Sequence, residues 1–378
     1  MSRRNILQTG ALSLVLSLFH GVAGQNAASA QAEVTPGLER ELQVAGAVFT
    51  LSNEAAGNRV VAFVRGRDGG LRDGGAYATG GTGTGASLQS QNALVLSDDR
   101  RFLLAVNAGS NEISSFAVRG AALELRSRVS SHGTRPVSIT EDGGLVYVVN
   151  AGAPSNVAGF ELDRQGRLHD LPGSVRPLSA DAAGPGQVQI SPDGRELVVT
   201  ERLTSKISSF PIDDHGRLGA PKVFASAGTT PFGFSFTRRG TLLVSEAATT
   251  SLSSYSFDRH GNLSVVSPAV SDHEAAPCWV ASSVDQRFAF VANAGSQSIS
   301  SYSVERSGVI TLRAEKGGDA GPGSAPQDLG IEPHGEYLYL LDRGNAGIAR
   351  FDASQPTALK YLDLVGVLAP FASGIAVY

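Results

Sequence analysis

Cysteine is almost absent from this chain of 378 residues, since Cys278 is the only one. An intrachain disulfide is therefore excluded, and the fold must be stabilised by burial of apolar surface and by hydrogen bonding. No recognisable base accompanies this cysteine in the sequence. We therefore expect a buried thiol beside Trp279 rather than a nucleophile.

Strong charge of either sign is also lacking. Lys and Arg number 31 against 35 for Asp and Glu, the net charge is −4, and no long run of like charges occurs. This balance argues against nucleic acid as a partner. Paired cysteines and closely spaced histidines are missing, so no zinc motif is present, and no Gly-x-Ser-x-Gly sequence indicates a serine hydrolase.

No apolar run is long enough to span a membrane as a mature helix. The apolar stretch 11–19 is short, Arg3 and Arg4 precede it, and Ala28-Ser29-Ala30 offers small residues to a signal peptidase. We therefore expect a signal peptide at 1–30, a linker at 31–44, and export to the periplasm or the medium. SRRNILQ, from residue 2, resembles the twin-arginine signature, with an ordinary secretory signal as the alternative.

The chain is rich in one repeated phrase: a valine-rich strand ending in Asn or an acid, a small polar spacer, and Ile-Ser-Ser-Phe or a variant. Strong copies are VNAGSNEISSF, TERLTSKISSF, SEAATTSLSSY and ANAGSQSISSY, which begin at residues 106, 200, 245 and 292, and weaker copies begin at 52, 149 and 341. A period of roughly 45 to 50 residues is typical of propeller blades.

Each repeat predicts four antiparallel strands. In one copy, strands at 187–190 and 196–200 flank a Ser-Pro-Asp-Gly turn, a third strand follows at 207–212, and the turn at 214–218 leads into the fourth. The sequence thus predicts an all-β, seven-bladed propeller as one domain over 45–378.

The two ends of this domain predict how the ring closes. The first repeat begins at Gly46 in the pattern of a second strand, and residues 370–378 look like a first strand with nothing after it. We therefore expect the C-terminal strand to pair into the first blade and so to remove two open sheet edges.

The phrases SPDGRELVVTE and LLAVNAGSNEISSFAV resemble the seven-bladed lactonase family, which includes 6-phosphogluconolactonases and carboxymuconate cyclases, and also the YVTN-type surface propellers. The resemblance covers residues 45–378. It implies hydrolysis or formation of a lactone, with a small lactone or carboxylate as substrate. The Pro-His-x-His segment common in lactonase relatives is replaced here by Arg135-Pro136-Val137-Ser138, and no lysine cluster could hold a phosphate, which argues against a sugar phosphate.

The expected site lies at the rim where first strands start and second strands end, because this rim collects the long loops. Glu201 and Glu246 stand where most repeats have Asn, and they are candidates to activate water. The candidate cations and donors for the oxyanion are Arg135, Arg202, Arg343 and His132. The candidate substrate-binding residues are Asn107, Asn150, Gln187, Trp279, Asn293, Gln327 and Asp342. The alternative is that each residue at the end of a second strand only hydrogen-bonds its own spacer loop.

We expect no metal and no cofactor, with Ca²⁺ held by converging Asn, Glu and Asp oxygens as the alternative. Asp272-His273-Glu274 reads as a solvated rim loop, with an acid, a base and their partner at the rim as the alternative. Gly80–Gly85 reads as a crossover rather than a phosphate loop, because it precedes a strand. A second class of function also fits these repeats, namely a monomeric binding propeller of the cell envelope without catalysis.

Overall fold

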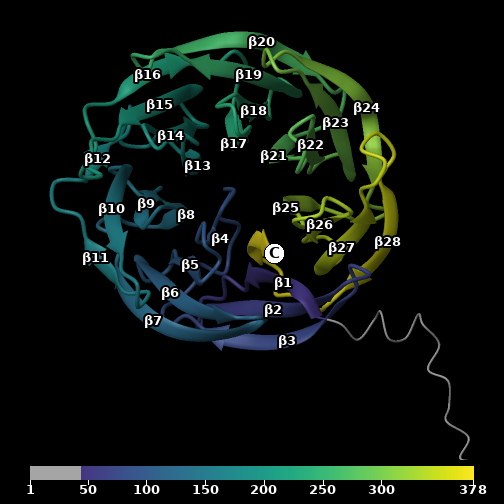
Figure 1. The fold of residues 1–378 in the computed structure, drawn as a ribbon, viewed down its shortest axis with the longest axis horizontal. Coiled ribbons are helices and arrows are strands. Elements are labelled where there is room, and N and C mark those ends of the chain that lie inside the picture. Colours follow the sequence, from purple (N-terminus) through teal and green to yellow (C-terminus); the bar gives the residue numbers. More distant parts are fainter. Residues whose placement is uncertain (1–43) are drawn as a thin grey trace, which may run out of the picture.

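The computed structural model describes residues 44–378, so the predicted signal peptide (1–30) and all but the last residue of the predicted linker (31–44) lie outside the described residues. From Val44 onward the chain forms strands, turns and loops, and no helix in this part could cross a membrane. Seven antiparallel sheets surround a central axis (Figure 1). The prediction of an all-β, seven-bladed propeller is confirmed.

Each sheet is one blade, and its strands follow from the channel outward. Blade 1 contains β29 (Ser373–Val377), β1 (Val44–Leu51), β2 (Arg59–Gly66) and β3 (Leu71–Ala78). Blade 2 contains β4 (Leu94–Leu96), β5 (Phe102–Asn107), β6 (Glu112–Arg119) and β7 (Ala122–Ser130). Blade 3 contains β8 (Pro136–Asp142), β9 (Leu145–Asn150), β10 (Asn156–Leu162) and β11 (Leu168–Asp170), with β12 (Arg176–Pro177) also paired to β10. Blade 4 contains β13 (Pro185–Ile190), β14 (Glu196–Glu201), β15 (Lys206–Pro211) and β16 (Lys222–Ala225).

The remaining three blades have the same order. Blade 5 contains β17 (Pro231–Phe236), β18 (Leu242–Glu246), β19 (Ser251–Phe257) and β20 (Leu263–Ser271). Blade 6 contains β21 (Pro277–Ser282), β22 (Phe288–Asn293), β23 (Ser298–Val304) and β24 (Ile310–Asp319). Blade 7 contains β25 (Pro326–Ile331), β26 (Tyr337–Asp342), β27 (Gly347–Asp352) and β28 (Lys360–Val365).

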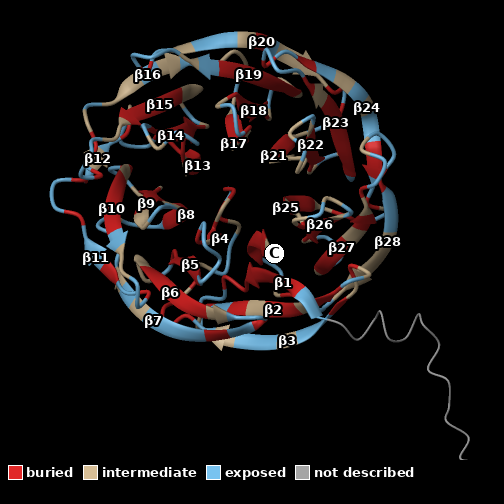
Figure 2. Ribbon diagram, in the orientation of Figure 1, coloured by how far each residue is buried: buried red, intermediate tan, exposed pale blue. Residues whose placement is uncertain are grey.

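The core lies between neighbouring blades, around the second and third strands. The second strands β5, β14 and β18 are buried along their whole length, whereas the outer strand β7 is largely exposed. Figure 2 shows this change from buried inner strands to exposed outer ones. Because both faces of a second strand pack on adjacent blades, these strands have apolar central residues and no exposed position, whereas exposed positions are most frequent in an outer strand such as β7.

The ring closes where β29 pairs with β1. Val48 lies opposite Val377 and Phe49 opposite Ala376, and Ala47 and Tyr378 exchange two backbone hydrogen bonds of 3.0 Å. Arg65 Nε donates to the Tyr378 carbonyl oxygen at 3.1 Å. The prediction that the C-terminal strand pairs into the first blade is confirmed.

The crossover between β3 and β4 does not stay on the rim but reaches into the channel (Figure 1). The Gln91 side chain donates to the Val280 carbonyl oxygen at 2.8 Å and accepts from the Val280 N–H at 3.0 Å. Its backbone N–H donates to Gly186 at 3.0 Å, and Ser90 Oγ donates to Val137 at 2.7 Å. The segment 87–92, called the plug below, therefore ties blade 2 to blades 3, 4 and 6.

Candidate functional site

The repeated phrase encodes one recurring hydrogen bond. Asn107 Nδ2 donates to Ser114 Oγ at 2.8 Å, and Asn293 Nδ2 donates to Ser300 Oγ at 2.7 Å. In blade 4 the direction reverses, and Ser208 Oγ donates to Glu201 Oε1 at 2.5 Å. The residue at the end of the second strand thus fixes the first serine of Ile-Ser-Ser, seven positions later. This bond explains why the strand end and the Ser-Ser sequence repeat together.

The other candidates at strand ends form hydrogen bonds with the loops around them. Asn150 Nδ2 donates to the Ser131 carbonyl oxygen and to Asn156 Oδ1, both at 2.9 Å. Asp342 accepts hydrogen bonds from the backbone N–H groups of Ala325 and Gly344 and from the Asn345 side chain. Asn107, Asn150, Asn293 and Asp342 are each 0% exposed. At these four positions the observed hydrogen bonds fit the alternative given above, that a residue at the end of a second strand only holds its own loop. Their role in substrate binding stays a prediction.

Glu201 and Glu246 are also fully buried, away from water at the mouth. Glu201 accepts from the Ser179 N–H at 3.1 Å and from Thr204 Oγ1 at 2.8 Å, in addition to its bond with Ser208. Glu246 accepts from Ser226 Oγ at 2.7 Å and from the Tyr255 hydroxyl at 2.9 Å.

The two carboxylates differ in how completely they are satisfied. Burial raises the pKa of Glu246, although its hydrogen bonds with Ser226 and Tyr255 oppose this, and Glu246 Oε2 is buried without a partner. Neither carboxylate forms an ion pair among the described residues. Their catalytic role stays a prediction, and it requires one of them to reach a cation.

Two candidates lie apart from the remaining cations. His132 Nε2 lies 2.9 Å from Asp170 Oδ1, and its ring stacks on Phe160 with centroids 5.5 Å apart, which directs it toward the outer strands β10 and β11. Arg343 follows the end of β26 in blade 7, whereas Arg202 follows the end of β14 in blade 4, and Figure 1 shows these two blades on different sides of the channel. The structure therefore does not bring all four predicted donors together.

Arg135 and Arg202, in contrast, both contact the plug. Arg202 Nη1 donates to Gln89 Oε1 at 3.1 Å, and Arg135 Nη2 reaches the Ser87 carbonyl oxygen at 3.4 Å. The pKa of Arg202 is lowered, first by burial and also by the charge of Arg135. Arg202 Nε is buried without a hydrogen-bond partner, and neither arginine forms an ion pair with a carboxylate in residues 44–378. Two neighbouring guanidinium groups without an acidic partner form a site that attracts an anion.

Aromatic side chains form the wall beneath the two arginines. The Arg202 guanidinium lies over the Phe232 ring, 5.2 Å from its centroid, and Phe232 packs edge-on against Trp279. Trp279 Nε1 donates to the Ser90 carbonyl oxygen at 3.0 Å, so this indole holds the plug. Burial raises the pKa of the neighbouring Cys278 thiol to about 12, which keeps it protonated.

Three glutamines lie in the channel below the mouth. Gln187, Gln189 and Gln91 line a cavity of about 280 Å³. Gln187 Oε1 accepts from the Phe234 N–H at 2.6 Å, and the side chain is 0% exposed. Gln327 is also buried, on the innermost strand of blade 7. Both residues belong to the channel wall, and their role in substrate binding stays a prediction.

Asp328 is a channel residue that the sequence analysis missed. It is 2% exposed, and it accepts hydrogen bonds from the backbone N–H groups of Asn92 and Leu329. Burial raises its pKa to about 7. The available signal was an acid in an innermost strand, at the position that Gln187, Gly233 and Trp279 occupy in other blades.

The expectation of a solvated Asp272-His273-Glu274 loop is wrong for its two acids. Asp272 is 0% exposed and Glu274 is 7% exposed. Asp272 accepts a hydrogen bond from Ser300 Oγ at 3.3 Å, and Glu274 accepts one from Ser298 Oγ at 2.9 Å. Burial raises the pKa of Asp272 to about 6. In residues 44–378 no group of three or more His, Cys, Asp or Glu side chains could hold a metal ion.

The fold defines a class of protein, the seven-bladed β-propellers. A family model described as "Lactonase, 7-bladed beta-propeller" matches residues 43–177, 155–250 and 244–363. The chain belongs to this lactonase family. A search of curated proteins gave no match.

Solved structures show the same fold at low sequence identity. The periplasmic gluconolactonase of Pseudomonas aeruginosa is 16% identical, with a TM-score of 0.70 over 87% of this chain and 99% of that one. A proposed 6-phosphogluconolactonase of Bacteroides uniformis is 19% identical, with a TM-score of 0.71 over 89% of this chain and 100% of that one. A streptogramin B lyase, 14% identical, has a TM-score of 0.57 over 76% of this chain and 87% of that one. At these identities the likeness shows the fold alone.

Proposed function

We propose that this protein is an exported hydrolase that opens a small lactone at the mouth formed by Arg135, Arg202 and the plug. The observation that carries the proposal is the pair of neighbouring guanidinium groups without a carboxylate partner, one of them with a buried, unpartnered Nε. Membership of the lactonase family and the fold of the Pseudomonas aeruginosa gluconolactonase support the same reaction.

The chemistry follows from where charge develops. Water adds to the lactone carbonyl carbon, the ring C–O bond breaks, and the proton lost by the water ends on the released ring oxygen. The carbonyl oxygen carries negative charge in the tetrahedral state, and Arg202 offers it a guanidinium that is already stripped of most of its water. Arg135 is placed to bind the hydroxyl or carboxylate groups that a sugar lactone also carries.

Export is part of the proposal because the N-terminal sequence supports it. Arg3 and Arg4, the short apolar stretch 11–19 and Ala28-Ser29-Ala30 match the three parts of a signal peptide. An epitope-tagged chain should appear outside the cytoplasm, and replacing both arginines by lysine should block this only if the twin-arginine route is used.

The activity is tested with a panel of sugar and aliphatic lactones, with and without chelator. Arg202→Ala is expected to lower kcat/KM about 10² to 10³-fold, the loss typical of removing one donor to an oxyanion. Arg195→Ala is the matched control, because Arg195 is exposed in the β13–β14 turn of the same blade. Equal activity of Arg202→Ala and wild type would contradict the proposal, and no turnover of any lactone by wild type would favour the binding propeller instead.

Glu201→Gln and Glu246→Gln separate catalysis from loop stability. If either carboxylate activates water, its variant loses activity while its melting temperature stays close to that of wild type. If the carboxylate only holds its loop through the observed hydroxyl and backbone N–H donors, stability falls and kcat is unchanged.

A further inference from the structure

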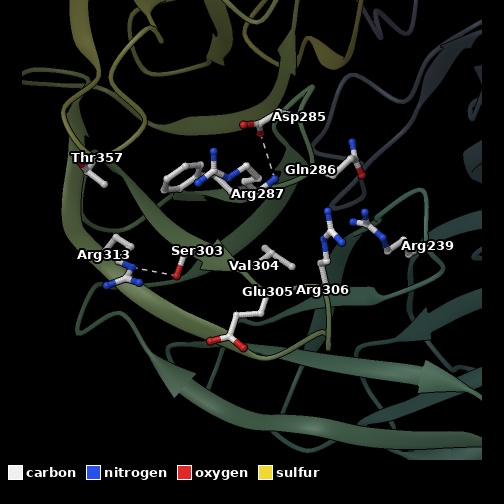
Figure 3. A pocket seen from close by; sticks show the side chains of 11 residues that line it. Arg239, Asp285, Gln286, Arg287, Ser303, Val304, Glu305, Arg306, Arg313 and Thr357 are labelled. Atoms are coloured by element: carbon white, nitrogen blue, oxygen red, sulfur yellow. Dashed lines mark hydrogen bonds between the residues drawn. The ribbon is translucent and has the colours of Figure 1, made fainter.

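A second cluster of arginines lies on the opposite side of the ring, away from the mouth. A pocket of about 760 Å³ is lined there by Arg239, Arg287, Arg306 and Arg313. It lies between the β17–β18 turn of blade 5, the β21–β22 turn and strands β23 and β24 of blade 6, and the β27–β28 turn of blade 7. Figure 3 shows the guanidinium groups of Arg239 and Arg306 directed toward one another. We call this the arginine pocket.

The four guanidinium groups have no carboxylate partner. None of them forms an ion pair with another described residue, and the one side-chain hydrogen bond among them is from Arg313 Nε to Ser303 Oγ, at 2.9 Å. Two acids also line the pocket, so it contains four cationic side chains and two anionic ones: Asp285 accepts from Ser283 Oγ and Glu305 from Ser307 Oγ. The pocket therefore has an excess of positive charge that the fold does not neutralise.

Blade 2 supplies an internal comparison. The equivalent surface there is also lined with four arginines, namely Arg101, Arg119 and Arg126 of blade 2 and Arg164 of blade 3. In blade 2, however, Arg126 lies 2.9 Å and Arg119 4.0 Å from Glu124, and Arg101 lies 3.7 Å from Asp99. Three of these four arginines therefore have a carboxylate within 4.0 Å, whereas none of the four in the arginine pocket has one within residues 44–378.

One of the differences between the two blades lies in the fourth strand. Glu124 pairs with Ala117, one position after Phe116, and Thr311 pairs with Ser303, one position after Tyr302. Phe116 and Tyr302 both end the repeated phrase, so Thr311 occupies the position of Glu124. Blade 6 therefore lacks the acid that neutralises the arginines of blade 2.

We propose that the arginine pocket binds an acidic oligosaccharide. The volume lies in the range of small-molecule sites, about 300 to 1,000 Å³, and it has room for more than one sugar ring. Spaced guanidinium groups suit carboxylate or sulfate groups on successive sugars. Gln286, Ser303 and Thr357, together with the two acids, supply donors and acceptors for sugar hydroxyls, and the Phe288 ring offers an apolar face.

Calorimetric titration of the full chain tests the proposal. The probes are tetragalacturonate, a sulfated tetrasaccharide and neutral maltotetraose, each at low and at moderate salt. At least one acidic probe should bind, its affinity should fall as salt is added, and maltotetraose should not bind. The two acidic probes distinguish a carboxylate ligand from a sulfate ligand. Equal binding of maltotetraose, or no binding of either acidic probe, overturns the proposal.

Variants at the exposed position 311 test whether the ligand binds in the arginine pocket, and they leave every arginine intact. Thr311→Glu places in blade 6 the acid that Glu124 supplies in blade 2, and it should weaken binding about tenfold or more. Thr311→Gln introduces a side chain of the size of glutamate without its charge, and this variant should bind like wild type. Glu124→Thr should create a second site in blade 2. Lactone turnover should be the same in all three variants. Unchanged binding in Thr311→Glu, or loss of binding in Arg202→Ala, would place the ligand elsewhere and refute the assignment.

Discussion

Closure of the ring can be tested with a single methyl group. Gly46 lies in β1, and a Cβ added there would stand 1.7 Å from the Tyr378 carbonyl oxygen. The alanine can be accommodated only if the chain around Tyr378 moves away. That movement breaks two backbone hydrogen bonds with Ala47 and the hydrogen bond from Arg65. At about 1 kcal/mol for each neutral bond and about 2 kcal/mol for the charged one, Gly46→Ala should destabilise the fold by about 4 kcal/mol.

Thermal unfolding measures this effect. For a chain of this length, 1 kcal/mol corresponds to about 1 to 2 °C, so the melting temperature should fall by about 4 to 8 °C. Gly57→Ala is the matched control, because a Cβ at position 57 of the same blade meets nothing within 4 Å. If the two alanine variants melt within about 1 °C of each other, the pairing of β29 does not contribute about 4 kcal/mol to the stability of the fold.

Two further predictions concern the channel. Because the pKa of Asp328 is raised to about 7, the folded state holds this proton more tightly than the unfolded state, so the stability contributed by the protonated group is lost as pH rises from about 4 to about 7. The free energy of unfolding of wild type, measured by urea titration, should therefore fall by up to about 4 kcal/mol over this range relative to that of Asp328→Asn. Parallel pH profiles of the two proteins would refute the raised pKa of Asp328. Gln91→Ala leaves the N–H and carbonyl of Val280 unpaired and should cost about 2 to 4 kcal/mol in the same assay, with no change expected for exposed Gln165→Ala.

The sequence predicts the blades well because their order is local. Alternation, Ser-Pro-Asp-Gly turns and the repeated phrase each lie within a few residues, and the strands at 187–190, 196–200 and 207–212 were found as β13, β14 and β15. The pairing of 370–378 with blade 1 was also predictable, since one blade lacked a first strand. The strands and turns that repeat along the chain can therefore be predicted from the sequence alone.

The site was harder to predict because its contacts are not local. Gln91 and Val280 are 189 positions apart, and nothing in the composition of a Ser- and Gln-containing crossover indicates that it enters a channel. The first strands also carry a register shift, as between Pro185 and Gln187, which changes the face that each following side chain occupies. Asp272 looked solvated because its partner Ser300 comes from a later strand.

The bond between Gln91 and Val280 also bears on how this gene could change by recombination. Repeats of this kind can be duplicated or lost as units, and each neighbouring pair of blades would still pack. In this chain, however, a side chain of blade 2 spans the channel to the backbone of blade 6. A ring with one blade more or fewer would have a different diameter, and the amide would no longer reach its partner. The length of one glutamine side chain thus matches the diameter of a ring of seven blades.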